Sequence, residues 1–325
     1  MKYLSVSACA EKWGINDSAV RRYCIMGRIP GAVMKNNSWR IPENAKRPAR
    51  IDPTPAPDKK ELPPLAAKLV NQKNGRNYHG LYDYVQLNLT YSSCRMASCR
   101  LTRDQIDTII RKGKVAVAFE PMKVSDVIET LNHSYCVDYI LEHVMDPLTP
   151  VFILRLHYLL MSGTIDARDE RVAPGEFRRP DSPPYKRKLN PASQIGTDLT
   201  ALLKEYEKKD FAELADILDF HVRFETIFPF EDANGRIGRL LMFKECLRRE
   251  VMPFILDDKR RGRYIEGIKK WEKNRNPLTV VVQEAQQNFE SQIELQILLA
   301  RSKQFQPAGY SEGEIFVEDD EDDDE

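Results

Sequence analysis

Residues 224–239 read Phe-Glu-Thr-Ile-Phe-Pro-Phe-Glu-Asp-Ala-Asn-Gly-Arg-Ile-Gly-Arg, and the rest of the chain is interpreted outward from this stretch. The apolar run at 214–224 that leads into it has the pattern of a buried helix. Pro229 stops that helix, because proline cannot continue one. A tight turn of small and Asx residues follows, and a second helix begins near Arg236. The sequence therefore predicts two helices joined by one tight turn.

The residues after the proline are of the types that bind phosphate. Asn234 and Gly235 lie just ahead of a helix start, where backbone N–H groups and the helix dipole favour an anion. Arg236 and Arg239 are three residues apart and share one face of the first turn. Asp232 adds a carboxylate, a ligand that Mg²⁺ accepts together with phosphate oxygens. These residues predict a pocket for a nucleotide di- or triphosphate.

The same stretch resembles the signature of the Fic family, His-Pro-Phe-x-(Asp/Glu)-(Gly/Ala)-Asn-(Gly/Lys)-Arg-x-x-Arg. Eight of its nine specified positions match, and the exception is Phe228, which stands where the family has its catalytic histidine. The resemblance implies a mostly α fold with a β-hairpin flap, and ATP and Mg²⁺ as ligands. It assigns the metal to Asp232 and the nucleotide to Asn234, Gly235, Arg236, Arg239 and, on a later helix, Tyr264.

Phe228 leaves three interpretations of function open. In the first, the domain binds a nucleotide, transfers little or no AMP, and serves a DNA-binding transcription regulator. In the second, the chain is an enzyme of altered chemistry whose base comes from elsewhere. In the third, Phe228 is an engineered or recently inactivating change in an ordinary protein adenylyltransferase. A general base typically contributes about 10²–10⁴-fold to the rate, and a phenyl ring cannot accept a proton.

A segment before the core resembles the inhibitory helix of many Fic proteins, (Ser/Thr)-x-x-x-Glu-(Gly/Asn). Aligned on Ser93, the glutamate position falls at Ala97 and the next position at Ser98. Aligned on Ser92, the glutamate position falls at Met96. In the family this glutamate pairs with the second arginine of the signature. The absence of this glutamate implies that Arg239 is free for phosphate. The inhibitory glutamate and the catalytic histidine are then both missing, which favours the first interpretation.

The first 50 residues predict a small separate domain. Two short helices, from Leu4 to Gly14 and from Ser18 to Met26, precede a hairpin at 33–41. The run resembles the excisionase-like and MerR-like winged helix-turn-helix, in which the second helix enters the major groove. That resemblance predicts DNA contacts, mainly with phosphates, by Arg21, Arg22, Arg28, Lys35 and Arg40. The alternative is a protein-docking module with solvated arginines, and two copies of so small a unit could pair as a homodimer.

Charge is unevenly distributed along a chain that is neutral as a whole. Residues 1–60 hold 12 Lys or Arg against 5 Asp or Glu, whereas residues 318–325 are all acidic. We expect a winged helix-turn-helix at 1–50, a proline-rich linker at 51–61, a Fic-like domain at 62–300 and a disordered acidic tail at 301–325. A basic loop at 174–190 resembles the family's flap, the place for a protein target.

The composition is that of a water-soluble protein. The 325 residues are 42% hydrophobic and 30% charged, and no apolar run approaches the roughly 20 residues of a membrane helix. The six cysteines form no Cys-x-x-Cys pair, which predicts reduced thiols in a cytoplasmic protein without membrane contact. His157 and His221 lie on apolar helical faces, where a hydrogen-bonded core role is commoner than catalysis.

Overall fold

The structure of the chain is a computed structural model that describes residues 2–25, 29, 31–35, 38–48, 61–75, 80–115, 122–168, 172–179, 189–209 and 212–304. Residues 51–60 of the expected linker at 51–61, the middle of the expected flap at 180–188 and residues 305–325 of the expected tail at 301–325 lie outside the described residues. Residues 301–304 are the end of a helix, so the expected boundary of the disordered tail at 301 is too early. The described part is mostly helical, as the sequence predicts. None of its helices combines the length and the apolar character that crossing a membrane requires.

The N-terminal unit is built from two short helices and a small sheet. Helix α1 (Val6–Trp13) begins at Ser5, whose side chain accepts the Ala8 N–H, and it ends at Gly14 in the left-handed region with φ 62°. Helix α2 (Asp17–Ile25) follows. Strands β1 (Tyr3–Leu4), β2 (Val33–Lys35) and β3 (Ser38–Pro42) form an antiparallel sheet of order β1-β3-β2.

One boundary of this unit differs from the prediction. Leu4 is in β1, paired with Ile41, and not in the first helix. The reason is local, because the Ser5 side chain caps the helix and so fixes its start at Val6. The apolar core of the unit consists of Val6, Cys9, Ala10, Val20, Cys24, Ile29 and Ile41.

Residues from 64 onward form the helical domain. Its helices are α3 (Pro64–Asn74), α4 (Leu81–Met96), α5 (Arg103–Lys112), α6 (Val124–Glu142), α7 (Pro150–Met161), α8 (Ile195–Glu207), α9 (Leu214–Ile227), α10 (Asn234–Arg248), α11 (Arg261–Lys270) and α12 (Asn276–Gln304). Short 3-10 helices lie at Asp166–Arg168, Ala192–Gln194 and Asp258–Arg260.

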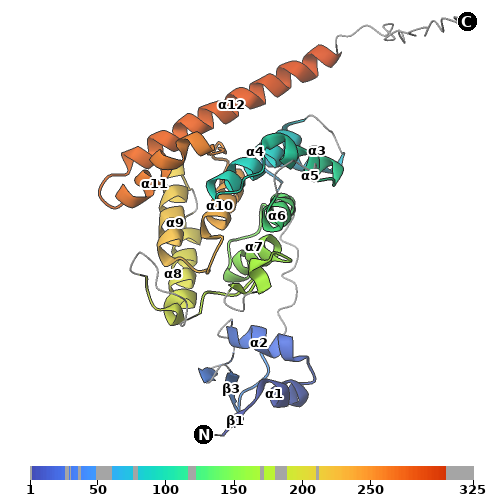
Figure 1. Ribbon diagram of the computed structural model, residues 1–325. Helices are drawn as coiled ribbons and strands as arrows, with labels where there is room; N and C mark the ends of the chain where they lie inside the picture. The colour runs from blue at the N-terminus through green and yellow to red at the C-terminus, as the bar shows by residue number, and fades with distance from the viewer. Residues whose placement is uncertain are drawn as a thin grey trace, which may run out of the picture.

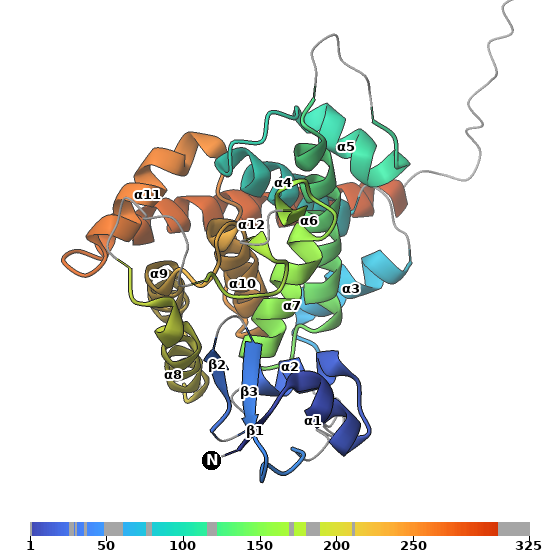
Figure 2. The same ribbon diagram turned by 60° about the horizontal axis from the view of Figure 1, so that its bottom comes forward.

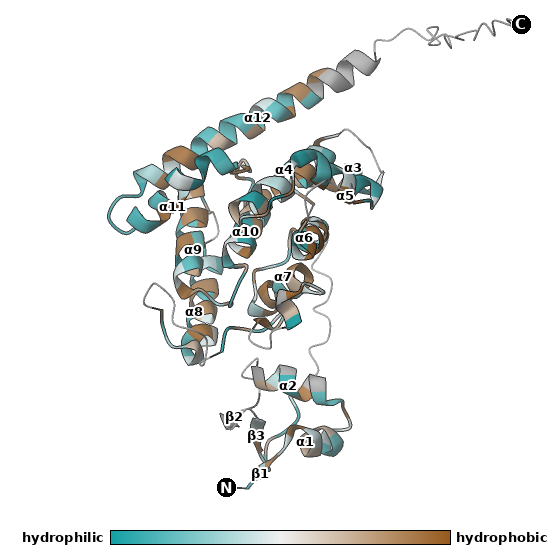
Figure 3. Cartoon of the chain, viewed as in Figure 1, coloured by the Kyte–Doolittle hydropathy of each residue, from teal (hydrophilic) through white to brown (hydrophobic). Residues whose placement is uncertain are grey.

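Helix α10 lies at the centre of this domain. It packs against α9 on one side and against α6 and α7 on the other, and it also contacts α4 (Figures 1 and 2). Every residue of α10 from Arg236 to Leu247 is buried. Helix α7 is hydrophobic over most of its length, whereas α12 carries long hydrophilic stretches (Figure 3). Because α10 is buried, its polar side chains lie inside the domain, and each of them needs a partner there.

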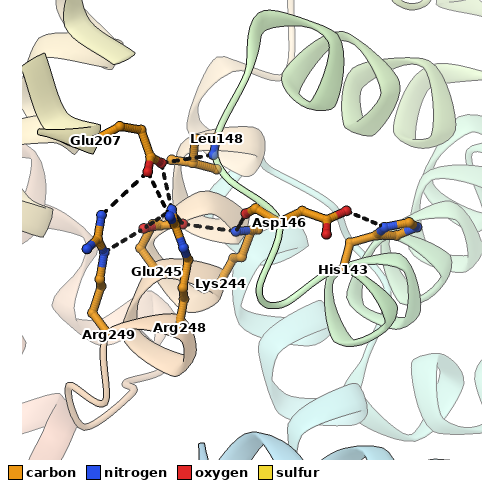
Figure 4. A network of polar contacts seen from close by, with 8 residues as sticks. All are labelled: His143, Asp146, Leu148, Glu207, Lys244, Glu245, Arg248 and Arg249. Carbon is orange, nitrogen blue, oxygen red and sulfur yellow. Dashed lines mark hydrogen bonds and ion pairs between the residues drawn. The ribbon is translucent and has the colours of Figure 1, made fainter. Parts of the chain in front are cut away.

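The C-terminal half of α10 contains a buried ion pair of adjacent residues, Lys244 and Glu245, both completely buried (Figure 4). The Lys244 ammonium donates to Glu245 at 3.0 Å and to the backbone carbonyl of Asp146 at 2.6 Å. Arg248 is 3.3 Å from Glu245 and makes a two-point pair with Glu207 of α8. This network fixes α10 to α8 and to the connection between α6 and α7.

The buried ion pair gives a stability prediction. Glu245→Gln removes the charge that compensates Lys244 and leaves the buried cation without its carboxylate, so we expect a loss of about 3 kcal/mol in the free energy of unfolding. Urea titration followed by far-UV circular dichroism measures it. Glu266→Gln, in the exposed i,i+4 pair with Lys270, is the matched control and should leave the midpoint unchanged. Equal midpoints for both variants would contradict the structural role of Glu245.

Candidate nucleotide site

The turn between α9 and α10 is held in a strained backbone conformation. Phe228, which follows the last residue of α9, has φ 51° and ψ 63°, and Ala233, just before α10, has φ 66°. Both are in the left-handed region that residues with a side chain rarely adopt, at about 1–3 kcal/mol each. Such residues persist only where surrounding contacts determine them.

Asn234 supplies the first of these contacts. Its side-chain oxygen accepts the Phe230 N–H at 2.9 Å, and its side-chain amide donates to the Phe230 carbonyl at 2.8 Å. Asn234 is only 3% exposed, and Phe230 is completely buried. The Phe230 ring stacks on the His157 imidazole, with centroids 3.9 Å apart. The Asn234 side chain thereby satisfies both the N–H and the carbonyl of Phe230, a residue that lies outside any helix or strand.

The first arginine of the turn is paired inside the domain. Arg236 is 4% exposed and forms ion pairs with Glu129 of α6 and, at 3.1 Å, with Asp232. Burial lowers the pKa of the Arg236 guanidinium. Sequence reasoning missed Glu129, which lies in a helix without a recognisable motif. The arginine is thus in the predicted place, but its charge already has partners.

The second arginine is not free, contrary to the expectation from the missing glutamate. Arg239 is 8% exposed, and its guanidinium donates to the Ser93 hydroxyl at 3.2 Å and to the Ser93 backbone carbonyl at 2.9 Å. The carbonyl is available because α4 ends at Met96 and the Ala97 N–H bonds to Cys94 instead. A cation at the C-terminal end of a helix is favourable.

The end of α4 supports the alignment on Ser93. Ser98 has φ 72°, the left-handed conformation that glycine and asparagine adopt most readily, and the motif has glycine or asparagine at this position. Ala97 is exposed and follows the last residue of the helix. Ser93 therefore lies against Arg239 even though the position four residues later has no acid.

The small residue Gly235 makes room for the same arginine. A Cβ atom at Gly235 would lie 3.0 Å from the Arg239 Nη1 atom, closer than ordinary contacts. A small pocket beside Arg239, with room for about one water molecule, is lined by Leu89, Ser92, Ser93, Arg239, Met242, Phe254 and Leu256.

Asp232 fits a metal ion only when phosphates accompany it. One carboxylate oxygen accepts the Ala233 N–H at 2.5 Å and the other accepts from Arg236, while 54% of the side chain is exposed. Mg²⁺ keeps several waters and needs one or two carboxylates beside substrate phosphates. Within the described ranges no group of three or more His, Cys, Asp or Glu side chains could hold a metal. The residues fit a magnesium ion carried in by a nucleotide.

The two histidines are buried and hydrogen-bonded, which confirms their expected core role. His157 Nδ1 accepts the Gly175 N–H at 2.9 Å, and burial lowers the pKa of His157 to about 4. His221 Nε2 is 2.5 Å from the Tyr264 hydroxyl, and burial lowers the pKa of His221 to about 3. Both imidazoles are thus engaged with partners inside the domain.

Tyr264, the expected nucleoside contact, is buried on α11 beside Arg239. The side chain is 3% exposed and belongs to the apolar cluster of α9, α10, α11 and α12. Its hydroxyl is bonded to His221. The expectation came from the position of its helix after the turn, but helix position alone does not fix which face α11 turns inward.

Of the five residues expected to contact DNA, two have described side chains. Arg21 on α2 and Arg40 on β3 are both exposed. Lys35 is in β2, opposite Ser38, but its side chain lies outside the described set, as do the side chain of Arg22 and the whole of Arg28.

Comparison with known proteins identifies the helical fold. Residues 147–246 match the family model described as Fic/DOC family. A Fic domain-containing signaling protein from Bacteroides thetaiotaomicron superposes with a TM-score of 0.58 at 18% identity, covering 75% of this chain and 94% of that one. A Fic family protein from Desulfovibrio desulfuricans gives 0.51 at 20% identity, covering 70% and 75%. A fragment of Fic-1 from C. elegans gives 0.52 at 16% identity, covering 74% and 72%. Among curated proteins none matches the sequence.

The buried His157 gives a pH prediction. Its folded pKa lies below the value of about 6.5 for an unfolded histidine, so the unfolded state binds more protons and the fold loses stability as pH falls from 6.5 toward 4. His157→Gln removes the titrating group and retains an acceptor for Gly175. Between pH 7 and pH 5, we expect the free energy of unfolding of His157→Gln to fall by about 2 kcal/mol less than that of the parent chain.

Denaturant midpoints at pH 8, 7 and 5 measure this difference. The pair at pH 8 and 7 is the internal control, because the imidazole is mostly neutral in both states there and the gap between variant and parent should change little. Parallel loss of stability down to pH 5 would show that His157 is not held neutral by burial.

Proposed function

We propose that this chain, whose residues 147–246 form a Fic/DOC family domain, binds a nucleotide, transfers little or no AMP, and acts as a DNA-binding transcription regulator. The observation that carries the proposal is Phe228. It follows α9 at the position where the Fic signature has its histidine, and its side chain is a hydrocarbon ring.

The surroundings of Phe228 support a low transfer activity. Phosphoryl transfer depends on positioning and charge, and a base then removes the proton of the attacking hydroxyl. His157 and His221 are each engaged with another group in the core, on Gly175 and Tyr264. A lost base alone reduces the rate by about 10²–10⁴-fold.

Nucleotide binding is supported by the start of α10. Its N-cap, Ala233, has no side chain able to bond the first N–H groups of the helix, so these donors can meet a phosphate. Arg236 and Asp232 lie beside them, already in contact. A phosphate that reaches Arg239 competes with Ser93, so we expect a modest affinity for ATP with Mg²⁺.

The regulatory part of the proposal is supported by the N-terminal unit. Two short helices followed by a hairpin carry exposed Arg21 and Arg40, in the most basic part of the chain. Lys and Arg side chains on one small unit suit a polyanion such as DNA. A protein target at 174–190 and a cytoplasmic location remain expectations of the same proposal.

The second candidate function is a protein adenylyltransferase whose site has been altered at one position. Intact features of the turn favour it, since Asn234 still closes the backbone and Arg236 still contacts Asp232. The two proposals differ in whether the chain as it stands transfers AMP.

Restoring the base tests the first proposal. We expect Phe228→His to raise self-labelling from radiolabelled α-³²P-ATP by at least about 10²-fold over the parent chain, because only the proton acceptor is missing. Calorimetric titration with ATP and Mg²⁺, run on both proteins, measures binding separately. The double variant Phe228→His, Asn234→Ala is the control, because it has the base without the closed turn. Brisk labelling by the parent chain would favour the adenylyltransferase instead.

The DNA-binding part is tested by salt dependence. With a random-sequence 30-base-pair duplex, fluorescence anisotropy should show binding by the full chain that weakens with salt. Arg21→Gln with Arg40→Gln should reduce the slope of log affinity against log salt by about 2, since each phosphate contact contributes about 0.9. Arg155→Gln with Lys204→Gln removes the same charge from exposed positions of the helical domain and should leave the slope unchanged. Equal slopes for both pairs would exclude the N-terminal unit as the contact.

A further inference from the structure

Arg178 is a buried cation that the proposed function does not use. It lies in the segment 172–179, which follows α7 and leads into the basic loop, and it is 7% exposed. Its backbone N–H donates to the Pro229 carbonyl at 2.9 Å. Its side chain donates from Nε to the Phe228 carbonyl at 3.0 Å and from Nη2 to the Asn190 carbonyl at 2.6 Å.

These three acceptors belong to two separate parts of the chain. Phe228 and Pro229 begin the strained turn, and Asn190 lies where the chain returns from the loop to α8. The planar guanidinium presents its donors in a fixed fork, so one side chain fixes the separation of both parts. A lysine at this position has a single nitrogen and cannot reproduce the fork.

The segment that carries Arg178 is itself anchored. The Gly175 N–H is held by His157, and Gly175 has φ 76°. A Cβ atom there would lie 3.0 Å from the Tyr158 Cβ and 3.2 Å from the Leu154 carbonyl, so no larger residue fits without displacement.

The return of the chain is anchored in the same way, because the Asn190 side-chain amide donates to Asp198 of α8 at 2.9 Å. The segment that carries Arg178 is thus attached to α7, and Asn190 is attached to α8. Arg178 connects both to the turn. The strain at Phe228 needs a contact that holds its carbonyl, and Nε of Arg178 is placed on that atom.

We propose that Arg178 is a positioning residue: it holds Phe228 in the left-handed conformation and makes the turn and the two ends of the 179–189 connection move as one unit. Nucleotide binding at the turn thereby depends on this one guanidinium. The coupling to a nucleotide rests on the proposed function, whereas the positioning of Phe228 does not.

Amide hydrogen exchange on the full chain tests the positioning role. In Arg178→Gln we expect the amides of Phe228, Phe230 and Ala233 to exchange at least about 10-fold faster, with the amides of α6 and α12 unchanged. Arg178→Lys keeps the charge and one donor nitrogen in place of the fork, so it should give an intermediate rate. It also provides a second variant in case Arg178→Gln fails to fold. Arg155→Gln, on the exposed face of α7, is the control for loss of a positive charge.

Two outcomes would overturn the proposal. One is unchanged exchange at 228–233 in Arg178→Gln. The other is a uniform increase over all helices, which would show a general contribution to stability and no local positioning. Calorimetric titration with ATP and Mg²⁺ adds the coupling: affinity should fall at least about 10-fold in Arg178→Gln. If the parent chain itself binds no ATP, the proposed function fails, and the exchange rates alone still decide the role of Arg178.

Discussion

The pair of hydrogen bonds between the Asn234 side chain and the Phe230 backbone is the constraint on which the centre of the helical domain depends. It closes the turn within a few residues and places the Phe230 ring in the core against His157. It also fixes where α10 begins. Once that start is fixed, the helical period directs Arg236 toward α6 and Arg239 toward α4. Each bond contributes about 1 kcal/mol net, but leaving either backbone group buried and unpaired costs more.

Two buried cations of this domain donate to the backbone carbonyl of a segment end. Arg239 donates to Ser93 and Lys244 to Asp146, and the exposed Arg261 donates to Met96 in the same way. Carbonyls at helix ends and in connections have no partner within their own element, so a cation from a neighbouring helix satisfies them. The arrangement converts basic side chains, which are costly to bury alone, into links between elements that are distant in sequence.

Local signals explain which parts of this molecule could be predicted from the sequence. Pro229, the Asx residues of the turn and Gly14 act within a few residues, so the helix boundaries near them agree with the structure. The partner of Arg239 could not be predicted this way, because it depends on α4 ending at Met96, a property of packing. Tyr264 shows the same limit, since its position on α11 was evident but its inward direction was not.

The contact between Arg239 and Ser93 sets a competition between an incoming anion and a helix end. A phosphate that takes the guanidinium leaves the Ser93 carbonyl without its donor, close to the left-handed residue Ser98 that ends the segment. Occupancy of the site and order at the end of α4 are therefore opposed. Under the proposed function, a bound nucleotide stabilises the folded chain as a whole but removes one contact from the end of α4, the helix that packs on α5.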